Sequence, residues 1–447
     1  MKTLNRVSDN EKKIRVNTLF LASILYVIGL IFCFLGKMTP EVFGIIILLI
    51  YINVRPRDLL SPINMIIAIY LVFYCIAPLF ATRYKESNWS SLTYTKVYIM
   101  ILTTYWISVC YLFYLEQRPH SLILYNDKSI NNLRKCKKTL FRMMLLSIFF
   151  LIFYIQKTGG MSAWINDASM TYLTRKGAGV FYLGFTLSLY IYSGAMGLLI
   201  YTKRSKLLFA LHFLIISSLF VFIGSKITVI QMILISLGFV LIEKKLLSKW
   251  TVGFSVFIVI ATILGLFQRN TDWMTFKDIL PYTLNYFDVL EQFEILVRDM
   301  NAGIMQSFLL PLNAVLLKFD VYICHPFRDL SVWLTSIYYP DIYDLGCTTQ
   351  WPIEADLYLS FIYFGGIPIL LLYLKILNWL HVKAKTKDPA FTIIYILEFT
   401  MIFSHYRSSI LIWWYWYLIP FYIFTYWIFK RKKTRVDFIS CEHLPIK

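Results

Sequence analysis

The stretch Leu207–Ile242, "LLFALHFLIISSLFVFIGSKITVIQMILISLGFVLI", decides the fold. It holds about 36 mostly apolar residues, and a single helix of that length would measure about 54 Å, far more than the ~30 Å core of a bilayer. The chain must therefore turn over inside the stretch. Gly224 tolerates the backbone geometry that ends a helix, and Ser225 can cap the next one. The sequence predicts a tight hairpin with Lys226 in the first turn of its second helix.

Long apolar runs recur along the whole chain. Of its 447 residues, 58% are hydrophobic and only 15% are charged, and apolar runs of about 17–25 residues recur, each long enough to span a membrane. We expect an all-α polytopic integral membrane protein, one domain over residues 1–447, with about twelve transmembrane helices. The expected spans are roughly 16–35, 41–54, 63–80, 94–115, 139–156, 178–201, 206–223, 226–242, 250–267, 353–376, 390–405 and 409–429.

The net charge of +19 is explained by topology. Basic clusters fall at alternate ends of successive apolar runs, which predicts that both termini are cytoplasmic. The first span lacks an A-x-A-like cleavage site, so we expect it to be an anchor. The longest interruption, about 268–352, is acidic and is expected to be a large outer, periplasmic loop. Because the basic residues follow the membrane sides, the partner they indicate is the lipid bilayer and not a nucleic acid.

A second hairpin is expected in the apolar run Ala390–Phe429, which is interrupted at "SHYRSS". Arg407 then takes the place of Lys226, and Ser408 and Ser409 can cap the final helix. Both hairpins place a cation on the outer side at a helix N-terminus, where free N–H groups and the macrodipole favour an anion. The alternative is that both side chains reach toward lipid headgroups.

The outer loop offers acids in two places. "NYFDVLEQFEILVRDM" (285–300) has helical apolar spacing and predicts an amphipathic helix at the membrane surface, whose Glu294 and Arg298 are spaced to pair. Glu354 and Asp356 follow Pro352, where carboxylates suit the start of a helix or can meet a substrate hydroxyl. The two acids lie about 200° apart around a helix, so only one can face a cleft.

Cysteine usage leaves one question open. Cys324 and Cys347 share the outer loop, so they are either a disulfide or two free thiols. No Cys/His spacing is typical of a metal site. We expect no metal and no other cofactor.

Three stretches resemble the Wzy-type O-antigen or oligosaccharide repeat-unit polymerases: "GSKITVIQMIL", "TGGMSAWINDASMTYLTRKGAG" and "EADLYLSFIYFGGIP". Lys226 stands where that family usually has Arg, which keeps the charge but loses the bidentate fork. The resemblance implies a GT-C-like architecture in the bacterial inner membrane. It also implies a glycosyltransferase that transfers a growing glycan from polyprenyl pyrophosphate onto a lipid-linked repeat unit, with a chain-length regulator protein as a further partner.

This chemistry needs cations for the leaving pyrophosphate and a general base for the attacking hydroxyl. The candidate cations are Lys226, Arg407 and Arg175, with Arg298 and His405 beside them, and the candidate bases are Glu354, Asp356 and His325. Two other classes stay open. An O-antigen ligase would share these features, whereas a lipid-linked oligosaccharide flippase should have shorter loops.

Overall fold

The computed structural model describes residues 9–56, 58–80, 89–117, 130–173, 177–223, 225–242, 244, 284, 287–344 and 348–429. These residues form helices and loops, with one isolated β-bridge between Ile304 and Phe361. Six helical segments in the described part are long and apolar enough to cross a membrane: Val16–Phe34, Pro62–Phe80, Leu92–Glu116, Lys135–Lys157, Gly179–Lys203 and Phe364–Lys385. The prediction of a helical membrane protein is confirmed at this level.

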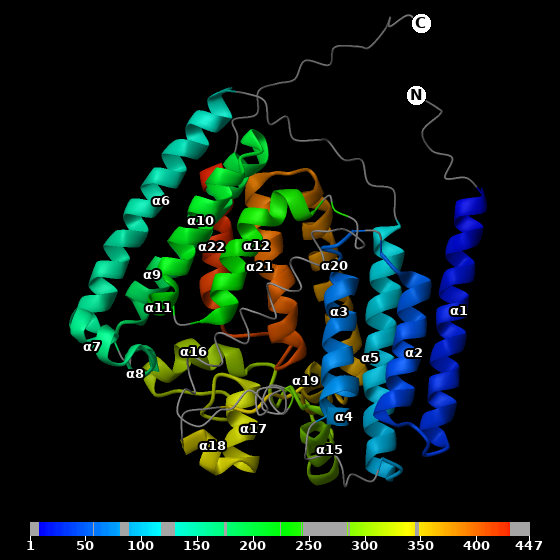
Figure 1. Cartoon of the computed structure of the whole chain (residues 1–447). Helices are drawn as coiled ribbons and strands as arrows, with labels where there is room; N and C mark the ends of the chain where they lie inside the picture. Colours follow the sequence, from blue (N-terminus) through cyan, green and yellow to red (C-terminus); the bar gives the residue numbers. More distant parts are fainter. Residues whose placement is uncertain are drawn as a thin grey trace, which may run out of the picture.

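The N-terminal helices pack on one side of the bundle (Figure 1). They are α1 (Asp9–Phe34), α2 (Pro40–Val54), α3 (Pro62–Leu71), which continues through η1 (Val72–Ile76) into α4 (Ala77–Phe80), and α5 (Leu92–Glu116). Local sequence sets their starts, because the side chains of Thr39, Ser61 and Ser91 each accept a backbone N–H in the first turn. Pro40 and Pro62 follow two of these caps, where a missing N–H costs nothing.

The opposite side of the bundle carries a second group of helices (Figure 1). They are α6 (Ile130–Lys157), α7 (Gly160–Asn166), α8 (Ala168–Leu173), α9 (Gly179–Lys203), α10 (Lys206–Ser218), α11 (Phe220–Ile223) and α12 (Lys226–Leu241). Gly197 lets α9 and α12 approach closely, since a Cβ there would lie 2.6 Å from the Ser236 carbonyl oxygen. The predicted hairpin is confirmed, because α11 ends at Ile223 and α12 begins at Lys226.

The C-terminal helices α20 (Ile367–Lys385), α21 (Pro389–Tyr406) and α22 (Tyr415–Phe429) stand in the middle. Helix α21 contacts α3 on the N-terminal side and α9 and α12 on the opposite side, so it joins the two sides. Loops expected to be cytoplasmic meet at one end of the bundle, where Lys385 pairs with Asp58 and the Lys244 carbonyl accepts from Leu59 N. These three loops, which the sequence places on one side of the membrane, therefore lie together at one end of the bundle.

The described part of the expected outer loop lies at the other end (Figure 1). It contains α15 (Leu290–Asp299), η3 (Leu310–Leu312), α16 (Asn313–Leu316), η4 (Leu317–Phe319), α17 (Leu330–Tyr338) and α18 (Pro340–Asp344), followed by α19 (Ile353–Phe361) and η5 (Phe364–Gly366). The helix expected near 285–300 is thus confirmed as α15.

Three predicted spans differ from the structure, and one of them, 206–223, is interrupted at Leu219 between α10 and α11. The span 353–376 is broken, because Ile362 and Tyr363 adopt positive φ values of 50° and 63°, a strained conformation for such residues. Backbone bonds hold the break: Ile362 N donates to Gly303 O at 3.1 Å. The span 409–429 begins only at Tyr415. The span 250–267 lies outside the described residues, and most other predicted spans coincide with helices of varying length.

Candidate functional site

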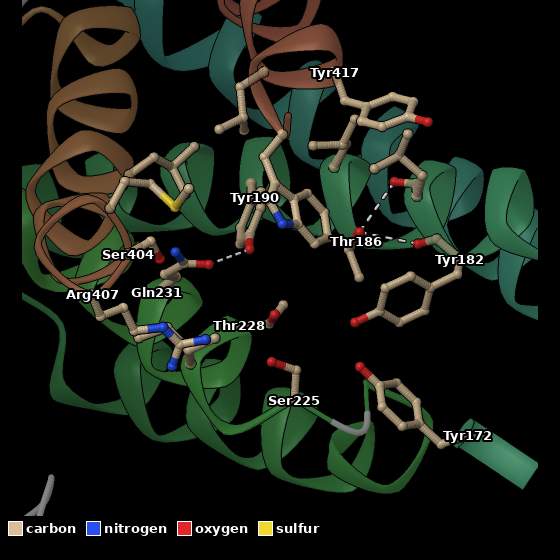
Figure 2. Close-up of a pocket in the computed structure, with 17 residues that line it drawn as sticks. Tyr172, Tyr182, Thr186, Tyr190, Ser225, Thr228, Gln231, Ser404, Arg407 and Tyr417 are labelled. Atoms are coloured by element: carbon tan, nitrogen blue, oxygen red, sulfur yellow. Dashed lines mark hydrogen bonds between the residues drawn. The ribbon is translucent and has the colours of Figure 1, made fainter. Parts of the chain in front are cut away.

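A cavity of about 230 Å³ lies between the two hairpin tips (Figure 2). Its walls come from five helices and the loop between α21 and α22. The polar lining consists of Tyr172, Tyr182, Thr186, Tyr190, Ser225, Thr228, Gln231, Ser404, Arg407 and Tyr417, and the rest is apolar. The structure therefore brings together the two tips that the sequence singled out separately.

Helical spacing explains why these side chains share one space. Ser225, Thr228 and Gln231 recur every three residues at the start of α12, and Tyr182, Thr186 and Tyr190 recur every four along α9. Residues at these spacings lie on one face of a helix. Each helix thus turns a polar stripe toward the cavity within an otherwise apolar sequence.

Arg407 supplies the cation of the described lining. It follows the last turn of α21, its guanidinium lies 5.4 Å from the centre of the Phe403 ring, and its carbonyl accepts from Trp351 N at 3.2 Å. The expectation that Arg407 sits at a helix N-terminus is wrong, because α22 begins eight residues later. Arg407 is instead at a helix C-terminus, where the dipole favours a cation. Ser408 and Ser409 accordingly do not cap α22; their hydroxyls donate to Asp329 and to the Leu411 carbonyl.

The start of α12 faces Arg407 across the cavity (Figure 2). Ser225 stands at the N-cap position but makes no capping bond with its side chain, and its hydroxyl lines the cavity. Lys226 is the first residue of α12, as expected; its side chain lies outside the described residues. The positive end of the α12 dipole and the Arg407 guanidinium thus act on one space, which suits an anion.

The remaining polar groups hold the cavity wall in shape. Tyr182 donates to the Ile223 carbonyl at 3.0 Å, which fixes α9 against the first hairpin. Tyr190 donates to Gln231, whose Nε2 donates to Thr400 at 2.9 Å. Figure 2 shows the hydroxyls of Tyr172, Tyr182, Ser225 and Thr228 turned toward the space opposite the Arg407 guanidinium. Hydroxyls around a guanidinium can bind phosphate oxygens or sugar hydroxyls.

An apolar groove of about 430 Å³ adjoins the cavity between α6, α9 and α22. Leu183, Leu187 and Tyr417 line both spaces, so the groove continues from the cavity into the apolar part of the bundle. Its other walls include Phe150, Pro420 and further apolar side chains of these helices. A charged head at Arg407 and a hydrocarbon chain in the groove would together fit an amphiphile.

Glu354 and Asp356 do not line this cavity, and both have no exposed surface. The Glu354 carboxylate accepts from Tyr70 at 2.5 Å and Tyr74 at 2.9 Å, which ties α19 to α3 and η1. A general base must reach the hydroxyl that it deprotonates. Glu354 is buried and does not face a cleft, so it cannot do so here. We assign it no catalytic role.

Asp356 links the outer segment to the second hairpin tip. It accepts from Ser307, from Ser360 at 3.3 Å and from the backbone N–H of Ile410 at 3.0 Å. Both acids therefore serve as buried acceptors, since burial of such groups requires hydrogen-bond partners. The expectation that one of them faces a cleft fails because neither carboxylate has any exposed surface.

The other candidate residues lie apart from the cavity lining. Arg298 bonds Glu294 at 3.3 Å and Asp299 at 2.9 Å within α15, which matches the pairing expected from spacing. His325 stacks on Trp333 with ring centres 4.0 Å apart, and burial lowers the pKa of its imidazole. His405 is fully buried behind Arg407. Arg175 and Cys347 lie outside the described residues, so the Cys324–Cys347 pairing stays open.

Sequence reasoning missed Glu398, an acid in the middle of α21. It accepts from Tyr415 at 2.9 Å and from Tyr422 at 2.6 Å, and Tyr415 also contacts His405. The signal was available, because an ionisable residue inside an apolar span marks a candidate functional site. Within the described ranges, no cluster of three His, Cys, Asp or Glu side chains could hold a metal ion.

Comparison with known proteins adds no assignment to this geometry. The chain gives no match to a protein-family model, to a curated protein or to a solved structure. The cavity, the groove and the residues that line them are therefore the basis for assigning a function.

Proposed function

We propose that this protein is a membrane glycosyltransferase that polymerises polyprenyl-pyrophosphate-linked oligosaccharide repeat units. The observation that carries the proposal is the cavity in which Arg407 faces the start of α12 and from which an apolar groove leads away. A lipid pyrophosphate has the matching parts, an anionic head and a long hydrocarbon chain. The sugar attached to the head would lie among the hydroxyls of the cavity lining.

The cavity supports departure of the leaving group. Negative charge develops on the pyrophosphate as the glycosidic bond breaks, and pre-positioned cations and donors stabilise that charge most strongly where water is excluded. Arg407 can bind two phosphate oxygens at once with its planar fork, while Lys226 would contribute a point charge. The hydroxyls of Ser225 and Thr228 add donors on the same side.

The described lining holds no carboxylate or imidazole. Activation of the acceptor hydroxyl therefore belongs to a group beyond this lining, and the three bases expected from the sequence, Glu354, Asp356 and His325, are not part of it. The lining supports stabilisation of the negative charge on the leaving pyrophosphate of the donor, and the proposal rests on that step.

We also propose how the protein is oriented in the membrane. Twelve spans in a GT-C-like arrangement, both termini in the cytoplasm and residues 268–352 outside would place the cavity at the outer face of a bacterial inner membrane. Donor and acceptor would both be lipid-linked, and a chain-length regulator protein would be a further partner. The basic loops at the opposite end of the bundle support this orientation.

An O-antigen ligase would need the same kind of donor site, so the test must separate the two enzymes. In a deletion strain, loss of a polymerase leaves surface glycan with one capped repeat unit, and loss of a ligase leaves none. Loss of a flippase traps the units inside the cell. Gel analysis of the glycan from that strain should show the single capped unit; either other pattern contradicts the proposal.

The purified protein gives a second test. Incubated with the lipid-linked repeat unit alone, it should release polyprenyl pyrophosphate and form a ladder of longer lipid-linked glycans. A preparation that is folded and yields no ladder contradicts the polymerase assignment.

A further inference from the structure

Behind the Arg407 cavity, a continuous chain of hydrogen bonds connects a buried acid to the second hairpin tip, residues 407–414. Glu398 Oε2 lies 2.9 Å from Tyr415 Oη, Tyr415 Oη lies 2.8 Å from His405 Nε2, and His405 Nδ1 lies 3.0 Å from the Ser409 carbonyl oxygen. His405 is fully buried, and Glu398 is 5% exposed. The direct contacts leave no room for water between these atoms.

The number of hydrogens in this chain can be counted. Each of the three contacts needs one hydrogen. A neutral imidazole supplies one N–H and Tyr415 supplies one O–H, so an ionised Glu398 with a neutral His405 leaves one contact without a hydrogen. The second oxygen of Glu398 does not help, because Tyr422 already donates to it at 2.6 Å. The complete chain therefore contains one added proton.

The added proton has two possible places with the same count. On Glu398, the carboxyl donates to Tyr415, which donates to His405. On His405, the imidazolium donates to Tyr415, which donates to the carboxylate. In both arrangements the group is neutral as a whole, which suits its burial because an isolated carboxylate there would be costly.

Among the described residues, no charged side chain contacts Glu398 or His405 and alters the number of hydrogens that they hold. The other titratable groups that face the pair are tyrosines. Tyr373 of α20 has its ring centre 4.5 Å from that of His405, and Tyr422 of α22 donates to Glu398. Tyr190 of α9 lies near Tyr422. Tyr395 and Tyr406 of α21 itself lie near Tyr373. Phenols stay neutral near pH 7.

We propose that Glu398 and His405 share one proton through Tyr415 and that this proton positions the tip carrying Arg407. With the proton bound, the Ser409 carbonyl and α22 are joined through α21. Without it, one contact in the network loses its hydrogen, and the tip opens more often because only its bonds to the outer segment, such as Ile410 N to Asp356, still hold it. Glu398 is a positioning residue in this account, which rests on the proposed function only in naming Arg407 as the group that is positioned.

The sign of the pH dependence follows from the count. The joined tip binds one more proton than the released tip, so raising the pH favours release. Once the pair titrates, the ratio of released to joined tip should rise about tenfold for each pH unit. Amide hydrogen exchange of peptides covering residues 407–414 measures that ratio directly, after correction for the intrinsic pH dependence of exchange.

The experiment uses the full-length protein in lipid nanodiscs without substrate, from about pH 5 to about pH 9. Wild-type protection of the tip should fall steeply with pH. Glu398→Gln should keep the tip protected throughout, because the amide Nε2 donates to Tyr415 in place of the carboxyl proton and Oε1 still accepts from Tyr422. Tyr415→Phe should expose the tip at every pH, since it removes the hydroxyl that joins Glu398 to His405 and so interrupts the chain of hydrogen bonds.

Tyr422→Phe is the matched control, because it removes a bond to the same carboxylate without touching the chain, and it should retain the pH dependence. A wild-type tip whose protection does not change with pH overturns the proposal. So does a Glu398→Gln protein that loses protection with pH as wild type does. Neither result bears on whether the cavity binds a lipid pyrophosphate, because no substrate is present.

Discussion

Replacing Asp356 tests how firmly the outer segment holds the Arg407 tip. Its carboxylate has no exposed surface and accepts from Ser307, Ser360 and the Ile410 N–H. In Asp356→Ala the two serines can still bond each other, since their oxygens are 2.7 Å apart. The cost therefore falls on the Ile410 N–H, which loses a charged acceptor in a buried place, and we expect a loss of about 3 kcal/mol including the vacated space.

Asp356→Asn should cost less, about 1 kcal/mol. Its single oxygen can keep the bond from Ile410 N, and its NH₂ group can donate to Ser307 after the hydroxyl turns. Thermal unfolding of the purified proteins should rank wild type above Asn and Asn above Ala, with a total fall on the order of 3 °C. Asp341→Ala, which removes an exposed acid of α18, is the control and should change nothing. An Asp356→Ala protein as stable as wild type would refute the reasoning.

Three further predictions concern other parts of the molecule. Burial raises the pKa of Glu354 from 4.5 to about 7 although the bond from Tyr70 lowers it; the folded state then binds this proton more tightly, so stability should increase by about 3 kcal/mol as pH falls from about 7 toward 4.5. Glu354→Gln should remove that increase in the thermal midpoint, and an unchanged pH slope contradicts the assignment. Cysteines placed at positions 341 and 385 should be labelled from opposite sides of the membrane, because they lie at opposite ends of the bundle; labelling from one side refutes the topology. Leu187→Trp should fill the mouth of the apolar groove and reduce photolabelling by a polyprenyl probe at least several-fold, whereas equal labelling would exclude the groove as the chain's binding place.

Local sequence was sufficient for the helices and for the first hairpin. The Leu207–Ile242 run is too long for one span, and Gly224 and Ser225 mark where it turns, so α12 begins where expected. The broken span at Ile362 could not be predicted, because the backbone of Gly303, some sixty residues earlier, accepts the bond that holds the break. The second hairpin was misplaced for a similar reason: residues 409–414 are apolar like the helix that follows, and composition does not separate them.

The site was predicted in part. Cations on the expected outer side, where the positive-inside trend disfavours them, identified Arg407 and the start of α12. Both line one cavity. Glu354 and Asp356 looked accessible because acids at a helix start usually face solvent, and only the fold brings Tyr70 and Ile410 to them. Glu398 was overlooked although an acid inside an apolar span is a signal in itself; only its partners, Tyr415 and Tyr422 of another helix, required the fold.

The central claim is that Arg407 holds the pyrophosphate of a lipid-linked donor. Binding of polyprenyl pyrophosphate to the purified protein in nanodiscs tests it directly, with Arg407→Gln compared to wild type and Arg298→Gln as the control that removes a cation already paired within α15. Loss of a charge-assisted bond of about 1.5–3 kcal/mol predicts a roughly 10- to 100-fold weaker affinity for Arg407→Gln and little change for Arg298→Gln. Equal affinity of wild type and Arg407→Gln would contradict the account.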